Sequence, residues 1–135
     1  MKKVSWLLSL WLPVVFWCGL LFYLSSIPNL KASQNPVLDE ILRTLSHFVF
    51  YAFGYFLFFR ALNYQKSKKN FLLPLGLVWL YGFFDELHQS FVPTRTFQLM
   101  DLAVDFGGVF IGKIIVEEFL PKLSKKILRK LKMDG

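Results

Sequence analysis

The run from Trp6 to Tyr23, WLLSLWLPVVFWCGLLFY, carries no charged residue, and it constrains the fold of this chain more than any other feature. An α-helix needs about 20 predominantly apolar residues to cross the roughly 30 Å hydrocarbon core of a bilayer. The run is too long for the apolar region of a typical signal peptide, and no small-x-small cleavage pattern follows it. We therefore predict a retained transmembrane helix, and a cleaved signal sequence behind Lys2 and Lys3 is the competing interpretation.

The rest of the chain is also too apolar for an ordinary soluble domain. Its 135 residues are 55% hydrophobic and include 16 phenylalanines, more apolar surface than so small a globule can bury. No repeat or low-complexity linker divides the sequence, and the single cysteine excludes an intramolecular disulfide. We predict one all-α membrane domain over residues 1–135, a four-helix transmembrane bundle. The expected spans and the basic tail are about residues 6–26, 41–62, 71–91, 101–120 and 121–135.

The basic residues predict the orientation of these spans. Twelve of the 16 lysines and arginines precede the first span, separate the second from the third, or follow the fourth. Because such residues favour the cytoplasmic side, both termini are expected in the cytoplasm. The tail FLPKLSKKILRKLK is predicted to be a basic amphipathic helix on the inner membrane surface, with an unstructured tail as the alternative. Since the basic residues alternate with apolar spans, the net charge of +7 does not indicate a nucleic-acid partner.

Polar side chains gather where this topology brings three helix ends to the outer side of the membrane. An ionisable group at the bilayer centre costs at least about 2.5–3.5 kcal/mol, so such groups are usually paired or face a cavity. They form either a structural cluster, with the arginines neutralising the acids, or a pocket open to the outer leaflet. The residues concerned are Arg43, His47, Tyr51, Asp85, Glu86, His88, Gln89, Arg95, Asp101 and Asp105.

The predicted fourth helix also carries a small-residue pattern. Gly108 and Gly112 follow Asp101 and Asp105 at steps of three and four residues, so glycines and acids share one stripe of the helix. Small residues in this spacing let two helix backbones approach closely. We expect this stripe to pack against the second or third helix of the same chain.

Two segments together resemble the VanZ-like family of bacterial membrane proteins. DELHQSFVPTR is followed by DLAVDFGGVFIG, and LRTLSHFVFY resembles the Arg/His segment of the preceding helix. SSIP, residues 25–28, is similar to the family's segment after the first span. The resemblance covers nearly the whole chain and is carried by Arg43, His47, Tyr51, Asp85, Glu86, His88, Gln89, Pro93, Arg95, Asp101, Asp105, Gly108 and Gly112.

The chain departs from the family's pattern at three positions. Thr94 stands where many members have glycine before the arginine, Thr44 where lysine is common, and Phe50 where an acid often precedes the tyrosine. We therefore expect that the outer turn at Thr94 differs in conformation and that one ion pair of the Arg/His segment is absent. The resemblance implies a multi-pass protein of the bacterial cell membrane, in a family named for a component that lowers susceptibility to the glycopeptide teicoplanin.

That implication suggests a site for a lipid-linked cell-wall precursor or a lipoglycopeptide, beside contacts with membrane lipids. Arg43 and Arg95 would bind phosphate or carboxylate. If the site is catalytic, Glu86 or Asp85 is the candidate general base and His47 the candidate acid. The further ligand-binding candidates are Tyr51, His88, Gln89, Asp101 and Asp105.

Two other hypotheses stay open. The acids and His47 or His88 have ligand types that suit a divalent metal, but no compact zinc-binding spacing is present, so no cofactor is predicted. In the non-enzymatic alternative the polar cluster is structural, and the protein acts through an unknown protein partner or through lipid organisation.

Overall fold

The computed structural model describes residues 2–63 and 70–122, and this part of the chain is helical and contains no strand. The all-helical prediction is confirmed. All but the first two residues of the predicted basic tail, residues 123–135, lie outside the described residues. The elements are α1 (Lys2–Ser25), α2 (Pro36–Asn63), α3 (Leu72–Gln89), α4 (Leu99–Ile114) and a π-helical turn, η1 (Ile115–Phe119).

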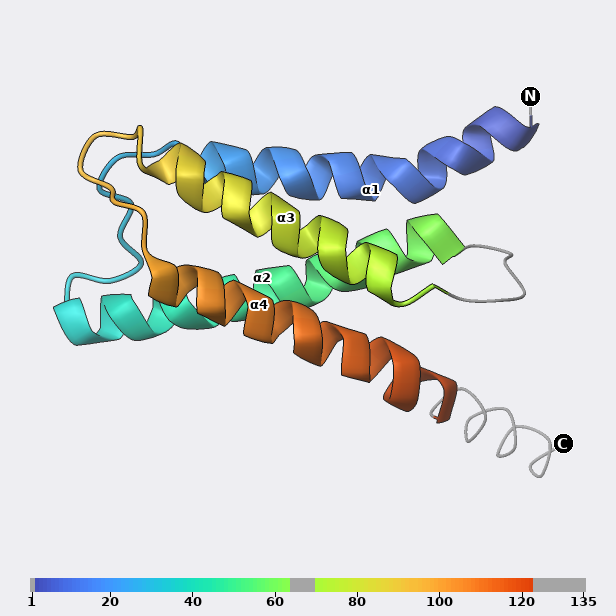
Figure 1. Cartoon of the computed structure of the whole chain (residues 1–135). Coiled ribbons are helices and arrows are strands. Elements are labelled where there is room, and N and C mark those ends of the chain that lie inside the picture. The colour runs from blue at the N-terminus through green and yellow to red at the C-terminus, as the bar shows by residue number, and fades with distance from the viewer. Residues whose placement is uncertain (1, 64–69, 123–135) are drawn as a thin grey trace, which may run out of the picture.

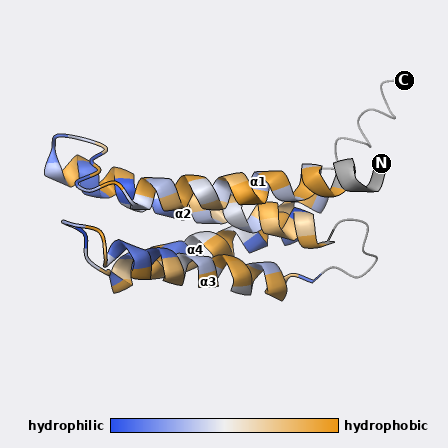
Figure 2. Ribbon diagram, turned by 90° about the horizontal axis from the view of Figure 1, so that it is seen from above, coloured by the Kyte–Doolittle hydropathy of each residue, from blue (hydrophilic) through white to orange (hydrophobic). Residues whose placement is uncertain are grey.

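The helices run side by side in alternating directions (Figure 1). The connections at residues 26–35 and 90–98 lie together at one end of the molecule, and the beginning of α1 and the end of α2 lie at the other. We call the first end, formed by these two connections and the adjoining helix ends, the polar end. Figure 2 shows hydrophilic residues gathered there and hydrophobic residues along much of the helices.

Two of the described helices are long and apolar enough to cross a membrane. These segments are Leu7–Ser25 in α1 and Pro36–Leu62 in α2. Large apolar side chains along the helices face outward, among them Phe16 and Leu12 on α1 and Val49 on α2. A contiguous apolar exterior of this kind suits contact with lipid or with another apolar surface.

Two close helix contacts build the core. The Trp17 ring of α1 packs directly over Gly54 of α2, where any Cβ would overlap the indole. The same indole donates its N–H to the Phe50 carbonyl oxygen over 3.1 Å. On α4, a Cβ at Gly108 would overlap the backbone of Phe48 in α2. These contacts place α2 in the middle of the bundle, between α1 and α4.

The second helix begins five residues earlier than the predicted span, at Pro36 rather than residue 41. Asn35 accounts for the difference, because its Oδ1 accepts the backbone N–H groups of Val37 (3.0 Å) and Leu38 (3.2 Å). Proline suits the first helical position, where an N–H would have no helical partner. The earlier start extends α2 into the polar end.

Candidate functional site

Three helices bring the predicted acidic residues together at the polar end. Asp85 and Glu86 lie near the end of α3 and Asp105 lies in the second turn of α4, and all three are buried. Across the interface, His47 of α2 places its Nδ1 2.9 Å from Asp105 Oδ1. The imidazole and the carboxylate therefore connect α2 directly to α4.

Glu86 is fully buried and holds the beginning of α4. Its Oε2 accepts the backbone N–H of Gln98 over 3.1 Å, at the residue that precedes the first turn of α4. Its Oε1 accepts a hydrogen bond from Gln89 Nε2 over 3.2 Å. A carboxylate suits this position, because the first N–H groups of a helix have no partner within it.

Gln89 lies between the acids and Arg95 and forms hydrogen bonds with both. Its Nε2 also donates to Asp85 Oδ2 over 3.0 Å, while its Oε1 accepts from Arg95 Nη1 over 3.0 Å. The rest of the guanidinium faces the end of α1, with Nε donating to the Ile27 carbonyl (3.2 Å) and Nη2 to the Leu24 carbonyl (3.4 Å). Burial lowers the pKa of the Arg95 guanidinium from its ordinary value, because desolvation opposes the charged form.

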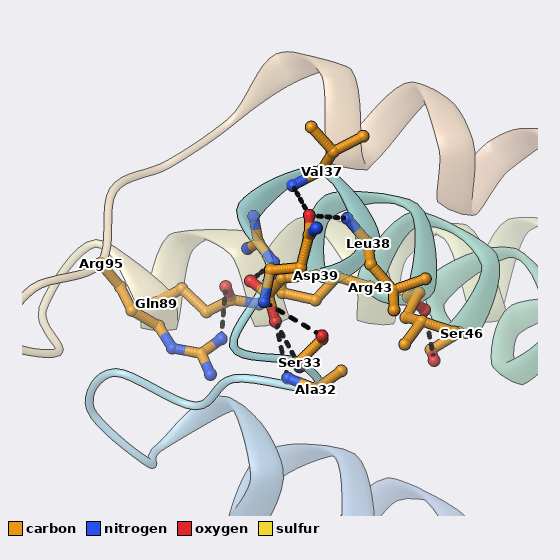
Figure 3. Close-up of polar contacts among 11 residues, drawn as sticks. Ala32, Ser33, Val37, Leu38, Asp39, Arg43, Ser46, Gln89 and Arg95 are labelled. Carbon is orange, nitrogen blue, oxygen red and sulfur yellow. Dashed lines mark hydrogen bonds and ion pairs between the residues drawn. The ribbon is translucent and has the colours of Figure 1, made fainter.

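Neither arginine of the polar end pairs with the acids that the structural hypothesis assigned to it. Arg43 Nε lies 3.4 Å from Asp39 Oδ2, one turn away on α2, and Asp39 also accepts the N–H groups of Ala32 and Ser33 (Figure 3). Within the described residues, no carboxylate forms an ion pair with Arg95. In this part of the chain, the hydrogen bonds of Arg95 all go to neutral acceptors, and Asp85, Glu86 and Asp101 act on its charge only at longer range.

A cavity of about 240 Å³ opens between α1, α2, α3 and the 26–35 connection. Its polar lining includes three cations, Lys31, Arg43 and Arg95, with Asp85 as the one carboxylate. A smaller cavity of about 100 Å³ adjoins it and shares Arg43 and Arg95. The other residues that line the larger cavity are Leu21, Leu24, Ser25, Leu30, Ala32, Ser46, His47, Phe50, Tyr51 and Gln89.

The predicted site residues thus fall into two groups, with His88 apart from both. Six of them line the larger cavity, whereas Glu86, Asp101 and Asp105 lie behind it toward α4. His88 faces α1 instead, with its Nε2 3.0 Å from the Ser26 hydroxyl and its ring stacked on Phe22 at 4.5 Å between centroids. The six cavity residues are Arg43, His47, Tyr51, Asp85, Gln89 and Arg95.

Behind the cavity lies a group of side chains that can hold a metal ion. One ligand atom from each of His47, Glu86 and Asp105 lies within 4.8 Å of the others. Within the described part of the chain, Asp105 Oδ2 and the Tyr51 hydroxyl are both buried and have no hydrogen-bond partner. The three potential ligands come from α2, α3 and α4, so the fold and not a local motif brings them together.

Comparison with known families decides what kind of protein this is. The profile of the VanZ/LLP1 family matches residues 10–120. The chain belongs to the VanZ/LLP1 family. Searches of the curated proteins and of the solved structures found no significant match. Membership of the VanZ family, together with two helices apolar enough to span a bilayer, indicates a membrane-associated protein.

The family's preference for glycine before the arginine has a structural reason in this VanZ-family chain. Thr94 has φ 71°, a left-handed conformation that favours glycine and is rare for a β-branched residue. Its Oγ1 accepts the backbone N–H of Asn29 over 3.2 Å, so the hydroxyl joins the two connections of the polar end. Thr94 thus adopts a conformation that glycine would take without strain, and its hydroxyl makes a contact that glycine could not make.

Sequence reasoning missed three contributors to the site of this VanZ-family protein. Lys31 and Ser25 line the cavity, and Ser25 lies in the SSIP segment that carried part of the resemblance. Gly82 leaves space beside the buried acids, because a Cβ there would lie 3.5 Å from Asp105 Oδ2 and 3.0 Å from the Tyr51 ring. Its position four residues before Glu86, on the same face of α3, was the available signal.

Proposed function

We propose that this VanZ-family chain is a multi-pass protein of the bacterial cell membrane that binds the anionic head group of a lipid-linked envelope molecule in the cavity at its polar end. Four helices cross the membrane, both termini are cytoplasmic, and the polar end faces the outer leaflet. Binding of a cell-wall precursor or of an acylated glycopeptide at this position changes susceptibility to glycopeptides such as teicoplanin.

The cavity lining is the observation that carries this proposal. Lys31, Arg43 and Arg95 supply three positive charges on its polar side, against the single carboxylate of Asp85. Arginine forms fork-like hydrogen bonds with phosphate and carboxylate groups. Because no carboxylate of the described residues forms an ion pair with Arg95, an anion can approach its guanidinium without displacing one.

The apolar part of the lining suits the lipid portion of such a ligand. Leu21, Leu24, Leu30 and Phe50 form the apolar wall, and the two apolar helices α1 and α2 border the same cavity. The head group would then lie at the charged side and the isoprenoid or acyl chain along the apolar wall. This matches a membrane surface, where polar head groups lie outside the apolar chains.

The placement in the membrane rests on the sequence and on the helix arrangement. The beginning of α1 and the end of α2 share the end of the bundle opposite the cavity, as the distribution of basic residues requires for a cytoplasmic side. The acids and the cavity then share the outer side. A fusion reporter placed in the 26–35 or 90–98 connection should report an external location.

A purely structural role for the polar residues is the alternative, favoured by the hydrogen bonds of Gln89, Glu86 and Arg95 between helices and connections. Arg43 distinguishes the binding role from the structural role, since its side chain is 43% exposed and, among the described residues, its one ion pair is with Asp39. A surface ion pair of this kind contributes little to stability, about 0–1 kcal/mol. Loss of binding in a stable Arg43 variant is therefore a loss of function and not of fold.

The test is binding of a polyprenyl phosphate to the purified full chain in lipid nanodiscs. Arg43→Gln should weaken binding about 10-fold, the equivalent of one charge-assisted hydrogen bond, and should leave the melting temperature unchanged. Arg60→Gln is the matched control, because Arg60 lies on the same helix at the opposite end and donates to the Ser9 carbonyl. Equal affinity in wild type and Arg43→Gln would exclude the proposed pocket.

Susceptibility provides the cellular readout. A sensitive Gram-positive host would express wild type, Arg43→Gln or Arg60→Gln at matched membrane abundance, and its teicoplanin susceptibility would be measured. Protection by wild type and Arg60→Gln but not by Arg43→Gln supports the proposal. Protection that follows abundance alone favours the structural alternative.

A further inference from the structure

The buried polar group behind the cavity has an unusual charge balance. Glu86 and Asp105 are fully buried, and within the described residues His47 is the one basic side chain in contact with either of them. Asp101 lies near the same group, in the first turn of α4. Buried carboxylates are expensive unless a cation, a proton or hydrogen bonds compensate them.

The distances among these groups suit a coordinated ion. Two ligand atoms at right angles on an ion, each about 2.1 Å from it, lie about 3.0 Å apart, and opposite ligands lie about 4.2 Å apart. His47 Nδ1 and Asp105 Oδ1 are 2.9 Å apart, and ligand atoms of His47, Glu86 and Asp105 all fall within 4.8 Å. The 2.9 Å pair matches two adjacent ligands, and the 4.8 Å limit lies slightly above the separation of opposite ligands, so small side-chain shifts would bring all three groups into one coordination sphere.

Two further polar atoms border the same space without a partner. Asp105 Oδ2 and the Tyr51 hydroxyl are buried, and neither has a hydrogen bond within the part of the chain described. Both side chains border the space over Gly82, whose missing Cβ would lie 3.5 Å from Asp105 Oδ2 and 3.4 Å from Tyr51 Cζ. A buried polar group without a partner destabilises the fold, and a bound ion with its water would satisfy both.

We propose that His47, Glu86 and Asp105 form a divalent metal site with open coordination positions, located between α2, α3 and α4 behind the cavity. One imidazole and two carboxylates are ligand types that manganese and zinc accept in proteins. The hydrogen bonds to Glu86 from Gln89 and from the Gln98 N–H leave other lone pairs of that carboxylate for the ion, and they orient it. The proposal concerns these residues themselves and does not depend on what the cavity binds.

The ion would also adjoin the cavity. His47 and Tyr51 belong to the cavity lining, whereas Glu86 and Asp105 lie on the far side of them. A divalent cation there adds positive charge close to Lys31, Arg43 and Arg95 and offers an open position toward the same space. An anionic group in the cavity could then complete the coordination of the ion.

The experiment is a Mn²⁺ titration of the metal-stripped full chain in detergent, followed by electron paramagnetic resonance and with no lipid ligand present. Wild type should bind one tight equivalent of Mn²⁺, and pulsed spectra should show coupling to one imidazole nitrogen. Asp105→Asn should weaken binding at least about 100-fold, beyond the 10–100-fold typical of residues that only support a ligand. Glu117→Gln is the control, because this carboxylate pairs with Lys113 at the opposite end of the bundle and should leave binding unchanged.

His47→Gln keeps the test decisive if Asp105→Asn does not fold. This half-buried residue can change without opening a large cavity, and the variant should lose the nitrogen coupling even where some Mn²⁺ still binds. Competition by Zn²⁺ at the same stoichiometry supports the site as well. The proposal is overturned if wild type binds no stoichiometric Mn²⁺ or Zn²⁺, or if His47→Gln and Asp105→Asn bind Mn²⁺ as wild type does. In that case a proton shared within the group compensates the buried acids.

Discussion

The same two helices, α2 and α4, meet in two different ways within a few residues. His47 and Asp105 join them through a hydrogen bond, while the neighbouring Phe48 and Gly108 bring the backbones together with no side chain between them. Gly112 repeats this approach one turn further on, where a Cβ would lie 2.6 Å from the Ala52 carbonyl oxygen. We call the second region, Gly108 and Gly112 against Phe48 and Ala52, the glycine contact.

From this comparison we infer that the glycine contact holds α2 and α4 close enough for His47 and Asp105 to meet. The aspartate side chain is short, so Asp105 can reach the imidazole of α2 only where the two helices lie unusually close. The glycine contact provides that closeness without any polar atoms of its own. The stripe of acids and glycines predicted from the sequence thus has two functions along one face of α4.

The largest loss of stability is expected from a substitution at Gln89, which removes hydrogen bonds within the polar end. Gln89→Leu removes the donor to Asp85 and Glu86 and the acceptor for Arg95, leaving two buried carboxyl groups and one half-buried guanidinium each short of a partner. Hydrogen bonds to charged groups contribute about 1.5–3 kcal/mol each, so losing all three should lower the free energy of unfolding by about 4.5 kcal/mol or more. Thermal or denaturant unfolding in detergent measures it.

Gln98→Leu is the matched control for that variant. Gln98 contributes its backbone N–H to Glu86, and its side chain is exposed, so replacing the side chain retains the bond. We expect no more than a small change in stability. Equal destabilisation of the two variants would mean that the amide of Gln89 does not hold the polar end together.

A smaller effect is expected from widening the glycine contact. Gly108→Ala places a methyl group into the Phe48 backbone and must push α4 away from α2. Overpacking of this kind costs about 1–3 kcal/mol, and the separation should also weaken the contact between His47 and Asp105. Unfolding experiments and nitrogen chemical shifts of His47 would report the two consequences.

Gly76→Ala tests whether the effect belongs to the contact or to glycine in general. A Cβ at Gly76 meets nothing within 4 Å, so alanine there should stabilise α3 by up to about 1 kcal/mol through its better helix propensity. Opposite signs at positions 76 and 108 are therefore expected. The same sign at both positions would contradict the close approach of α2 and α4.

The smallest effect is expected at the strained turn of the polar end. Thr94→Gly relieves the left-handed conformation but loses the bond to the Asn29 N–H, so these changes should nearly cancel. Thr94→Val keeps the strain and loses the bond, and it should be less stable than Thr94→Gly by about 1 kcal/mol. Melting temperatures of the two variants and wild type give the order. A more stable valine variant would contradict the strain at this residue.

Much of the architecture could be predicted because apolar runs determine where helices form. The four predicted spans coincide with α1, α2, α3 and α4 with η1 to within a few residues at most of their ends. The largest difference is at the start of α2. The span was predicted from hydropathy, which does not register the helix-capping signal of Asn35 and Pro36. Whether all four helices cross a membrane remains a prediction.

The faces of α3 show what sequence spacing could and could not give. With about 100° between successive helical residues, Glu86 and His88 point about 160° apart. Spacing could therefore have separated these two side chains, which we predicted to lie in one cluster; Glu86 contacts Gln98 and His88 contacts Ser26. Which neighbour each one meets depends on tertiary packing, so no local pattern could place Glu86 beneath α4 or assign Arg95 to backbone carbonyls.

The position of Arg95 affects the order in which parts of the molecule can fold during synthesis. The Leu24 and Ile27 carbonyls at the end of α1 have a guanidinium partner that lies 71 and 68 residues later in the chain. During synthesis these carbonyls emerge long before the arginine; until it arrives the Leu24 oxygen has the Ile27 N–H as its partner, whereas the Ile27 oxygen is left to water. The cavity-bearing end can therefore lose its water only after α3 and the following turn are in place, so it should be the last part of the bundle to mature.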